Sequence, residues 1–371
     1  MPGPVGVGLI GAGNISDIYL ENLNSFPDVD VLIVGDIDTD RAASQATKHG
    51  VPASGTTADV LAHPNVEIVV NLTIPAVHAE ISSAIIAAGK HVWSEKPIAI
   101  ERGSARALLE EAAAAGLRVG IAPDTVLGPG MQSAKRAIER GLIGRPLFAT
   151  TTMQWQGPEI FHPNPGFLFA RGAGPLFDMG PYYFSALIHI FGPVSSVAAV
   201  GLKALENRSI LVGPDAGTTF PVEVPSTINV LVEFESGGQS QSLLSTDSPL
   251  RRQGIVEISG TEGTITLPDP NMFSGRTAVI RPLDDVAGDQ DWTDVPQDGI
   301  VVGRGLGLLE MARAIRLGTP HRATGELAYH VLDTMLAAEE SAERHEFVVV
   351  QSTVAPIETM PLDFDPFART L

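Results

Sequence analysis

The residues Glu95-Lys96-Pro97 place an amine directly after a run of strand-forming residues, Lys90 to Trp93. Proline removes a backbone donor and restricts the residue before it to extended geometry, so we expect Lys96 in a fixed backbone setting. A charged side chain at the carboxyl end of a strand in an α/β sheet lies where such sheets bind ligands. Lys96 is therefore a candidate catalytic group; a surface lysine in a turn is the alternative.

A second group of polar side chains lies in the glycine-rich residues 172–183. If this stretch is helical, Asp178 and Tyr182 are four residues apart and share one face. Because Pro181 fits only the first turn of a helix, we predict that the helix begins near Met179 and that Asp178 lies close to its cap. An N-capping aspartate and a tyrosine in the core are the alternative interpretation.

The residues from Val5 to Ser16 are typical of a strand, a tight glycine turn and the start of a helix. Gly11 permits the turn, Gly13 lets the backbone approach a pyrophosphate, and the small Ser16 lets the helix pack on the strand. The N–H groups at the start of that helix suit phosphate oxygens. This arrangement predicts a dinucleotide-binding turn.

Asp36 ends the second predicted strand, Val29 to Gly35, about twenty residues beyond the glycine turn. An acidic side chain at this distance accepts both hydroxyls of the adenosine ribose. Ile37 follows, with no Arg or Ser there to bind a 2′-phosphate, so the sequence favours NAD over NADP. Asp36 as the N-cap of a helix from Thr39 is a second interpretation, and both roles are compatible.

The loop from Trp155 to Pro165 interleaves aromatic rings with imidazole and amide groups between prolines. Binding sites for small molecules combine apolar surfaces with a few placed polar groups, and sugars suit flat rings against C–H faces with polar groups on hydroxyls. Trp155, His162 and Asn164 are therefore candidate substrate contacts. A packed connector, with Trp155 and Phe161 in the core, is the alternative.

Strands and helices alternate through the first third of the chain, which predicts an α/β Rossmann domain with a doubly wound parallel sheet. From Ser195 onward, alternating strands between Gly, Pro and Asp turns predict an α+β C-terminal domain with a large, mainly antiparallel sheet. We place a dinucleotide-binding domain at residues 1–123 and a substrate-binding and oligomerisation domain at residues 124–371. Residues 206–225 and 284–304 are predicted to be long surface loops.

The composition is that of a globular enzyme, and it narrows the choice of partners. The chain has 371 residues, 24 Lys and Arg, 43 Asp and Glu, and a formal net charge of −19, so we expect neither nucleic acid nor membrane partners. It contains no cysteine, which excludes disulfides and Cys-based metal sites. His189, His321 and His330 lack ligand spacing, so no metal is expected. Without a basic leader or a membrane-spanning apolar run, we expect a soluble cytoplasmic protein.

Three motifs together resemble the Gfo/Idh/MocA oxidoreductases, which are nicotinamide-dependent dehydrogenases of sugars and cyclitols. The motifs are Gly11-x-Gly13-Asn14-Ile15-Ser16, Thr73-x-Pro75-x-x-His78 and Glu95-Lys96-Pro97. The resemblance covers almost the whole chain. It extends the expected cofactor site to further positions, namely Asn14, Ile15, Ile37, Thr73, Pro75, His78, Glu95 and Lys96. Since family members commonly associate through the C-terminal sheet, the resemblance also implies a homodimer or homotetramer.

The resemblance assigns residues 172–183 to the glycine-rich turn and Asp-x-Gly-x-His motif that faces the nicotinamide in this family. Tyr182 stands at the His position of this motif, as in the glucose–fructose oxidoreductase branch. This difference puts a His–Asp proton relay in doubt, while Lys96 and Asp178 remain as candidate catalytic residues. Asp124 replaces a common Asn, and Val126-Leu127 replaces a frequent Arg-Phe pair. We interpret this as the loss of an anionic-substrate contact, with Asp124 as a contact to a neutral ligand.

These residues predict hydride transfer between a hydroxyl-bearing carbon of a neutral sugar, anhydrosugar or cyclitol and NAD. Lys96 is the expected general acid/base, with Tyr182 completing the proton path and Asp178 orienting the hydroxyl. Desolvation and the positive nicotinamide ring are expected to lower the lysine pKa towards neutrality. Two alternatives stay open. One is an enzyme that retains its nicotinamide, as an internal sugar oxidoreductase or a redox-assisted glycosidase. The other is a non-catalytic cofactor-sensing regulator.

Overall fold

A computed structural model describes residues 3–282 and 291–371 of the chain. The chain divides into two compact units, and each is described by itself. Unit 1 comprises residues 1–128, 299–332 and 360–371, and unit 2 comprises residues 129–298 and 333–359. The functions predicted for residues 1–123 and 124–371 stay predictions.

Unit 1 is built on a sheet of six parallel strands in the order β3-β2-β1-β4-β5-β6. Its strands are β1 (Val5–Ile10), β2 (Val29–Gly35), β3 (Ala53–Gly55), β4 (Ile68–Asn71), β5 (His91–Ser94) and β6 (Val119–Ile121). Its helices include α1 (Ser16–Leu23), α2 (Thr39–His49), α3 (Thr57–Ala62), η1 (Pro75–Val77), α4 (His78–Ala87), α5 (Arg102–Ala114), η2 (Asp124–Leu127) and α8 (Leu306–Leu317). The predicted doubly wound parallel sheet is confirmed.

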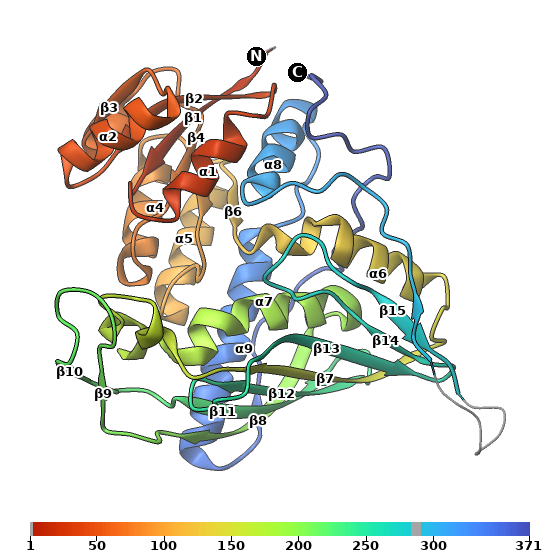
Figure 1. Cartoon of the computed structure of the whole chain (residues 1–371). Coiled ribbons are helices and arrows are strands. Elements are labelled where there is room, and N and C mark those ends of the chain that lie inside the picture. The colour runs from red at the N-terminus through yellow and green to blue at the C-terminus, as the bar shows by residue number, and fades with distance from the viewer. Residues whose placement is uncertain (1–2, 283–290) are drawn as a thin grey trace. The chain divides into compact units, whose positions relative to one another are not determined.

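The central strands of unit 1 are apolar because helices cover both faces of a parallel sheet. Every residue of β1 and β4 is buried. From β1, the chain adds β2 and β3 on one side of the sheet and then β4, β5 and β6 on the other side. Doubly wound sheets bind ligands at the carboxyl ends of the strands where this change of side occurs, here between β1 and β4. Figure 1 shows the strands and helices of this unit in red to orange, with α8 in blue.

Residues far along the chain complete unit 1. Arg313 of α8 donates from Nε to Asp28 Oδ2 at 2.8 Å, and Asp28 is completely buried. Thr370 donates to the same carboxylate from its backbone N–H, at 2.9 Å from Oδ1, and from its hydroxyl, at 2.7 Å from Oδ2. Burial opposes ionisation of Asp28, but these donors outweigh it and hold the pKa of Asp28 below its ordinary value. The buried charge is therefore fully paired.

Unit 2 contains a nine-stranded sheet in the order β16-β15-β14-β13-β7-β12-β11-β8-β17. Its elements are α6 (Pro129–Glu139), β7 (Pro146–Gln154), η3 (Pro158–Ile160), η4 (Gly166–Phe169), α7 (Gly174–Phe191), β8 (Val194–Leu202), β9 (Asn207–Ser209), β10 (Thr219–Pro221), β11 (Thr227–Phe234), β12 (Gln239–Ser245), β13 (Arg252–Gly260), β14 (Thr264–Thr266), β15 (Ala278–Ile280), β16 (Thr293–Asp294) and β17 (Val348–Val349). Helix α9 (Gly325–Arg344) passes from unit 1 to unit 2 after Leu332. Within this sheet β12 pairs with β7 in parallel and the other pairs are antiparallel, so the predicted mainly antiparallel sheet is confirmed.

One face of the large sheet is covered by α7 (Figure 1). Strand β11 alternates buried and exposed side chains, with Val230 and Val232 inside and Leu231 outside. The Phe191 ring of α7 stacks on Phe234 with ring centres 4.8 Å apart. The period of two therefore places the core on the side of α7.

Helix α7 corrects the prediction made from Pro181. The helix begins at Gly174, with Pro175 in its first turn, so Pro181 lies in its interior and Asp178 lies in its second turn rather than near a cap. An interior proline costs about 3 kcal/mol in an isolated helix. The burial of most α7 side chains offsets this cost.

The predicted loop at residues 206–225 is also corrected in part. Strands β9 and β10 pair as a small antiparallel sheet, and Phe220 of β10 packs against Phe169 with ring centres 5.6 Å apart. Strands of three residues contain too few alternations to be recognised in a sequence. The other predicted loop spans residues 284–304. Residues 284–290 lie outside the described residues, and the rest of the range contains the short strand β16.

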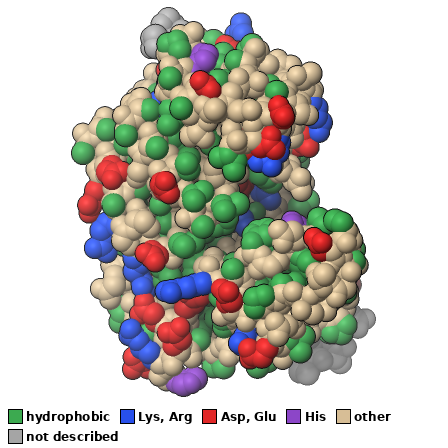
Figure 2. All heavy atoms as spheres, turned by 90° about the vertical axis from the view of Figure 1, so that its left-hand side faces the viewer, with side chains coloured by type: hydrophobic (Ala, Val, Ile, Leu, Met, Phe, Trp, Pro, Cys, Tyr) green, Lys and Arg blue, Asp and Glu red, His purple; other side chains and the backbone are tan. Residues whose placement is uncertain are grey.

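The acidic side chains visible on one face of the surface do not form a single patch. On the face shown in Figure 2, Asp and Glu side chains occur at several separate places, with Lys and Arg side chains among them. No helix within residues 3–282 and 291–371 combines the length and apolar character that crossing a bilayer requires.

Candidate active site

The glycine turn after β1 has the conformation that the sequence predicted. Gly11 has a φ of 104°, and an added Cβ would lie 2.7 Å from the backbone carbonyl of Leu72. A Cβ on Gly13 would meet nothing within 4 Å, so the backbone there borders open space. In the described part of the chain, no side chain caps the N-terminus of α1. A bound pyrophosphate fits this turn because it needs close backbone approach and unoccupied N–H donors.

Asp36 is buried at the end of β2, and its carboxylate joins the turn to α2. Its Oδ2 accepts the backbone N–H of Ala12 at 2.6 Å, and its Oδ1 accepts that of Asp38 at 2.9 Å. Arg41 adds two guanidinium bonds, from Nε to Oδ2 at 3.2 Å and from Nη2 to Oδ1 at 2.6 Å. Burial raises the pKa of Asp36, but these donors outweigh it and lower the pKa below its ordinary value.

Two features near Asp36 differ from the sequence interpretation. The N-cap of α2 is Asp38, whose side chain accepts from the backbone of Asp40 and Arg41, so Asp36 is not the cap. The contact between Arg41 and Asp36 was missed in the sequence. The two residues are five positions apart across a turn from strand to helix, and no sequence pattern predicts a contact at that spacing. The Arg41 side chain is 46% exposed, whereas that of Asp36 is 4% exposed.

Two aliphatic side chains stand exposed at this edge of the sheet. Ile37 follows β2 and is 96% exposed, and Ile74 follows β4 and is 63% exposed. Strands β2 and β4 flank β1 in the sheet, so these residues lie on either side of the glycine turn. Exposed apolar side chains beside a ligand-binding edge suit the flat face of an adenine ring.

Lys96 lies directly beyond the end of β5, as predicted, and is half-buried. Its neighbour Glu95 is buried and accepts the hydroxyl of Tyr19 on Oε1 at 2.9 Å. Glu95 Oε2 accepts the backbone N–H of Lys96 at 3.2 Å. Trp93 donates its indole N–H to the Tyr19 hydroxyl at 3.4 Å. The Glu95 carboxylate therefore fixes the backbone of Lys96 to α1, and its predicted contact to the cofactor stays a prediction.

The Thr73-x-Pro75-x-x-His78 motif forms a buried polar cluster after β4. Asn71 Oδ1 accepts the backbone N–H of Thr73 at 3.2 Å and its hydroxyl at 2.6 Å, and Asn71 Nδ2 donates to the His78 carbonyl at 3.0 Å. His78 is 1% exposed, and both of its ring nitrogens face backbone carbonyls. His78 therefore contacts protein groups on both sides, whereas the sequence predicted a contact to the cofactor.

Asp124 is 0% exposed and holds the start of α8. Its Oδ2 accepts the backbone N–H groups of Gly305 and Gly307, both at 2.9 Å, and its Oδ1 has no hydrogen-bond partner within the described residues. Burial raises the pKa of Asp124 to about 6 against the effect of these two donors. The predicted substrate contact has no exposed atom through which to act.

The raised pKa of Asp124 predicts how stability changes with pH. The folded state binds this proton more tightly than the unfolded chain, whose aspartates titrate near 3.8. Stability is therefore expected to fall as the pH rises from about 4 through about 6, by about 3 kcal/mol. The substitution Asp124→Asn should flatten this part of the profile in urea unfolding measured from pH 4 to 8. The exposed Asp30→Asn is the control, and an unchanged profile in Asp124→Asn would contradict the assignment.

Asp178 and Tyr182 lie one turn apart on α7, and Tyr182 is buried. The adjacent Tyr183 has a structural role: its hydroxyl accepts the backbone N–H of Gly254 at 2.8 Å and donates to the Thr152 carbonyl at 3.4 Å. The helical placement of Asp178 and Tyr182 agrees with the shared face expected from their spacing. Their catalytic roles stay predictions.

The aromatic loop, residues 155–167 of unit 2, presents a row of rings. Trp155 stacks on Phe161 with centres 5.5 Å apart, and His162 meets Phe167 edge-on at 5.4 Å. Phe161 is 59% exposed, so the packed-connector interpretation fails for it. Asn164 is exposed, and its backbone N–H donates to His162 Nδ1 at 3.0 Å. Rings and polar groups are thus interleaved here, and the predicted contact to a sugar stays a prediction.

A buried ion-pair cluster fixes the aromatic loop to the rest of unit 2. The guanidinium of Arg208 binds the carboxylates of Glu159 and Asp247 and donates to the Thr246 carbonyl at 2.9 Å. The same guanidinium lies over the Phe169 ring, 4.8 Å from its centre. No sequence pattern indicated this cluster, because its members come from three separate segments.

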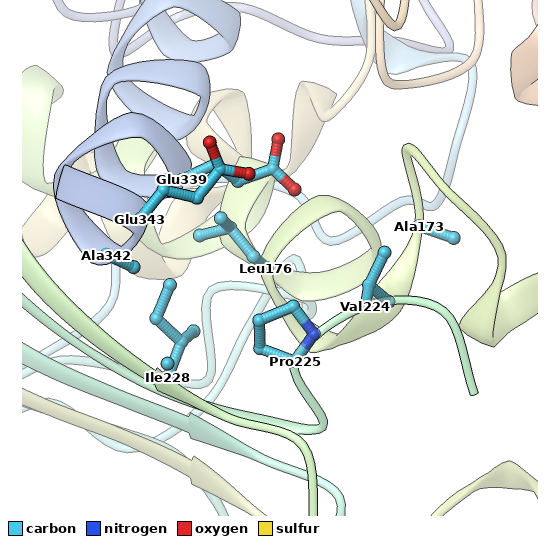
Figure 3. Close-up of a pocket in the computed structure, with 9 residues that line it drawn as sticks. Ala173, Leu176, Val224, Pro225, Ile228, Glu339, Ala342 and Glu343 are labelled. Atoms are coloured by element: carbon cyan, nitrogen blue, oxygen red, sulfur yellow. The ribbon is translucent and has the colours of Figure 1, made fainter. Parts of the chain in front are cut away.

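A small pocket of unit 2 lies between α7, α9 and the sheet (Figure 3). Its volume is about 130 Å³, and Leu176, Pro225 and Ile228 form its apolar lining. Glu339 and Glu343 lie one helical turn apart beside it, with their carboxylates close together. Burial and the neighbouring Glu343 charge raise the pKa of Glu339 to about 7.

Within the described ranges, no group of three or more His, Asp or Glu side chains is placed to hold a metal ion. His189 contacts Gln132 Nε2 at 3.1 Å, and His321 contacts the Val119 carbonyl at 3.2 Å.

Comparison with known families identifies the class of the protein. Residues 5–122 match the oxidoreductase family with an NAD-binding Rossmann fold, and residues 131–266 match the GFO/IDH/MocA C-terminal domain. Together these matches cover more than half of the chain. The chain belongs to the Gfo/Idh/MocA family of NAD-binding oxidoreductases, as its three motifs indicated.

Individual relatives are distant but similar over most of their length. Myo-inositol 2-dehydrogenase of Thermotoga maritima is 27% identical over 262 residues, covering 70% of this chain and 74% of that protein. Trans-1,2-dihydrobenzene-1,2-diol dehydrogenase of Sus scrofa is 26% identical over 268 residues, covering 71% and 74%. The structure of levoglucosan dehydrogenase with NADH and L-sorbose has a TM-score of 0.82 at 22% identity, over 94% of this chain and 99% of that one. This last similarity supports the fold.

Proposed function

We propose that the protein oxidises a CH–OH group of a neutral sugar, anhydrosugar or cyclitol, with NAD as the hydride acceptor. The observation that carries the proposal is the placement of Lys96 at the end of β5, in the same sheet edge as the glycine turn and Asp36. A proton acceptor next to a dinucleotide site is what alcohol oxidation requires. The names of the relatives, which act on myo-inositol and on a dihydrodiol, support a polyol substrate.

The geometry of unit 1 supports particular contacts to the cofactor. The turn at Gly11 and Gly13 and the uncapped start of α1 would bind the pyrophosphate, and Asp36 would accept the adenosine ribose hydroxyls. Ile37 and Ile74 would contact the adenine. Further cofactor contacts are proposed from the glycine-turn motif and from the Thr73-x-Pro75-x-x-His78 motif, namely Asn14, Ile15, Thr73 and Pro75.

NAD is the preferred cofactor in this proposal because Asp36 is ionised and repels a 2′-phosphate. Arg41 weakens this preference, since its half-exposed guanidinium is the local group able to bind such a phosphate. We therefore propose tighter binding of NAD than NADP, with a smaller difference than Asp36 alone would give.

For the chemistry, we propose that Lys96 removes the hydroxyl proton while the hydrogen on the same carbon leaves as hydride. Tyr182 passes that proton onward, and Asp178 orients the hydroxyl for Lys96. When bound, NAD supplies the hydride acceptor. Trp155, His162 and Asn164 of the aromatic loop contact the neutral substrate.

We also propose a homodimer or homotetramer formed through the exposed face of the large sheet in unit 2. Three strands of this sheet expose apolar side chains: Val200 and Leu202 on β8, Leu231 on its neighbour β11, and Phe148 on β7, which β12 separates from β11. Apolar side chains that recur on one open sheet face mark an interaction surface. The oligomeric state is measured directly by light scattering coupled to size-exclusion chromatography.

The proposed function is tested with a panel of monosaccharides, inositols and anhydrosugars, following NAD⁺ and NADP⁺ reduction at 340 nm. We expect stoichiometric NADH release from at least one neutral polyol, with a higher kcat/KM for NAD⁺. Turnover without NADH release would support a retained cofactor instead. NAD binding without turnover of any polyol would contradict the proposal and favour a cofactor-sensing regulator.

A further inference from the structure

His78 lies between two loops of unit 1 that the proposed function uses. Its Nε2 is 2.9 Å from the carbonyl oxygen of Thr73, in the loop after β4. Its Nδ1 is 2.7 Å from the carbonyl oxygen of Pro97, the residue that follows Lys96. One side chain therefore contacts both the loop beside the glycine turn and the turn that carries the candidate catalytic lysine.

The protonation of His78 limits what these two contacts provide. Burial lowers the pKa of His78, even though both carbonyls and the nearby Glu95 favour the charged ring. A neutral imidazole has one N–H, so two facing carbonyls compete for one proton, whereas an imidazolium would donate to both. The shorter contact, to Pro97, is the better placed to receive that N–H.

The surroundings of His78 make its two contacts rigid. Asn71 binds both Thr73 and the backbone of His78, and it also donates to the Ser82 hydroxyl at 3.1 Å. The Asn71 carbonyl accepts the backbone N–H of Glu95 at 2.9 Å. The Thr73 loop and the Lys96 turn are therefore joined through buried, hydrogen-bonded groups.

We propose that His78 is a positioning residue that couples the cofactor loop at Thr73 to the backbone of Lys96. This inference rests on the proposed function for the role of Lys96. His78 itself contacts neither substrate nor cofactor in this proposal. Its Nε2 contact with Thr73 is expected to affect the Kd for NAD, and its Nδ1 contact with Pro97 is expected to affect kcat.

Two variants separate the contacts, because the amide nitrogen of Asn matches Nδ1 and that of Gln matches Nε2. His78→Asn keeps the donor to Pro97 and removes the Nε2 atom that faces the Thr73 carbonyl, so the Kd for NAD should rise about threefold to tenfold with kcat little changed. His78→Gln places an amide donor opposite the Thr73 carbonyl and loses the donor to Pro97, so kcat should fall about tenfold to a hundredfold with the Kd little changed. His63→Asn, on a half-buried histidine of the same unit, is the control.

Hydrogen exchange followed by mass spectrometry tests the same coupling without any substrate. We expect faster exchange in residues 94–99 for His78→Gln and in residues 72–76 for His78→Asn. Calorimetric titration with NAD supplies the Kd, so a failure of the polyol panel would leave these two measurements intact. The proposal would be overturned if both variants lost NAD affinity and kcat equally, or if both kept wild-type values.

Discussion

Replacing Lys96 with alanine is expected to lower kcat on the best substrate of the panel by about 10² to 10⁴-fold, the range of general acid–base catalysis. The reason is that the hydroxyl proton would lose its acceptor while the hydride path is unchanged. The glycine turn and Asp36 do not depend on the Lys96 side chain. The Kd for NAD, measured by calorimetry, should therefore change by less than about threefold.

The matched control for this prediction is Lys48→Ala, which removes an exposed lysine of α2 that pairs with Asp17. It should leave both kcat and the Kd for NAD near their wild-type values. A Lys96→Ala protein that binds NAD and retains near-wild-type turnover would remove Lys96 from the mechanism and leave the base to be sought elsewhere.

Replacing Arg208 with methionine is expected to lower the free energy of unfolding by about 3–5 kcal/mol. The substitution leaves the buried Glu159 and the largely buried Asp247 without their common partner. It also frees the aromatic loop, because Glu159 lies within it. Urea unfolding followed by circular dichroism measures the loss, and the KM for the sugar should rise along with it.

Arg276→Met is the control for the ion-pair cluster, because Arg276 pairs with Asp294 at the surface of the same unit. An exposed pair contributes about 0–1 kcal/mol. If Arg208→Met and Arg276→Met lost the same stability, the cluster would contribute nothing beyond an ordinary surface pair. Adding Glu159→Gln to Arg208→Met should recover part of the lost free energy of unfolding, since it removes one of the two carboxylate charges left without a partner.

The conformation of the glycine turn and the position of Lys96 were predictable from the sequence, since local rules determine them. The turn at Gly11 follows from a glycine after an apolar strand, and Lys96 lies where the end of β5 places it. The N-cap was assigned to Asp36 instead of Asp38, and the contact of Arg41 with Asp36 was missed. Packing decides which of several neighbouring acidic groups caps the helix and which binds the guanidinium.

The contacts of Asp124 and His78 were not predictable, for two different reasons. Asp124 binds backbone groups 181 and 183 residues away, and no motif encodes such a contact. His78 was assigned from a motif that identifies the residue but not the carbonyls it faces. In unit 2, Pro181 was misread because tertiary burial outweighs a local helix preference.

The discontinuous composition of unit 1 has a consequence for synthesis on the ribosome. Residues 1–128 emerge first, but α8 lies in the segment that begins at residue 299, after the whole of residues 129–298. At ordinary translation rates this interval lasts about 10 to 35 s. During that time the nascent chain carries Asp28 and Asp124 without Arg313 and the Gly305 and Gly307 amides that receive them. Unit 1 therefore has all six strands of its sheet but lacks α8 until residues 129–298 have been translated.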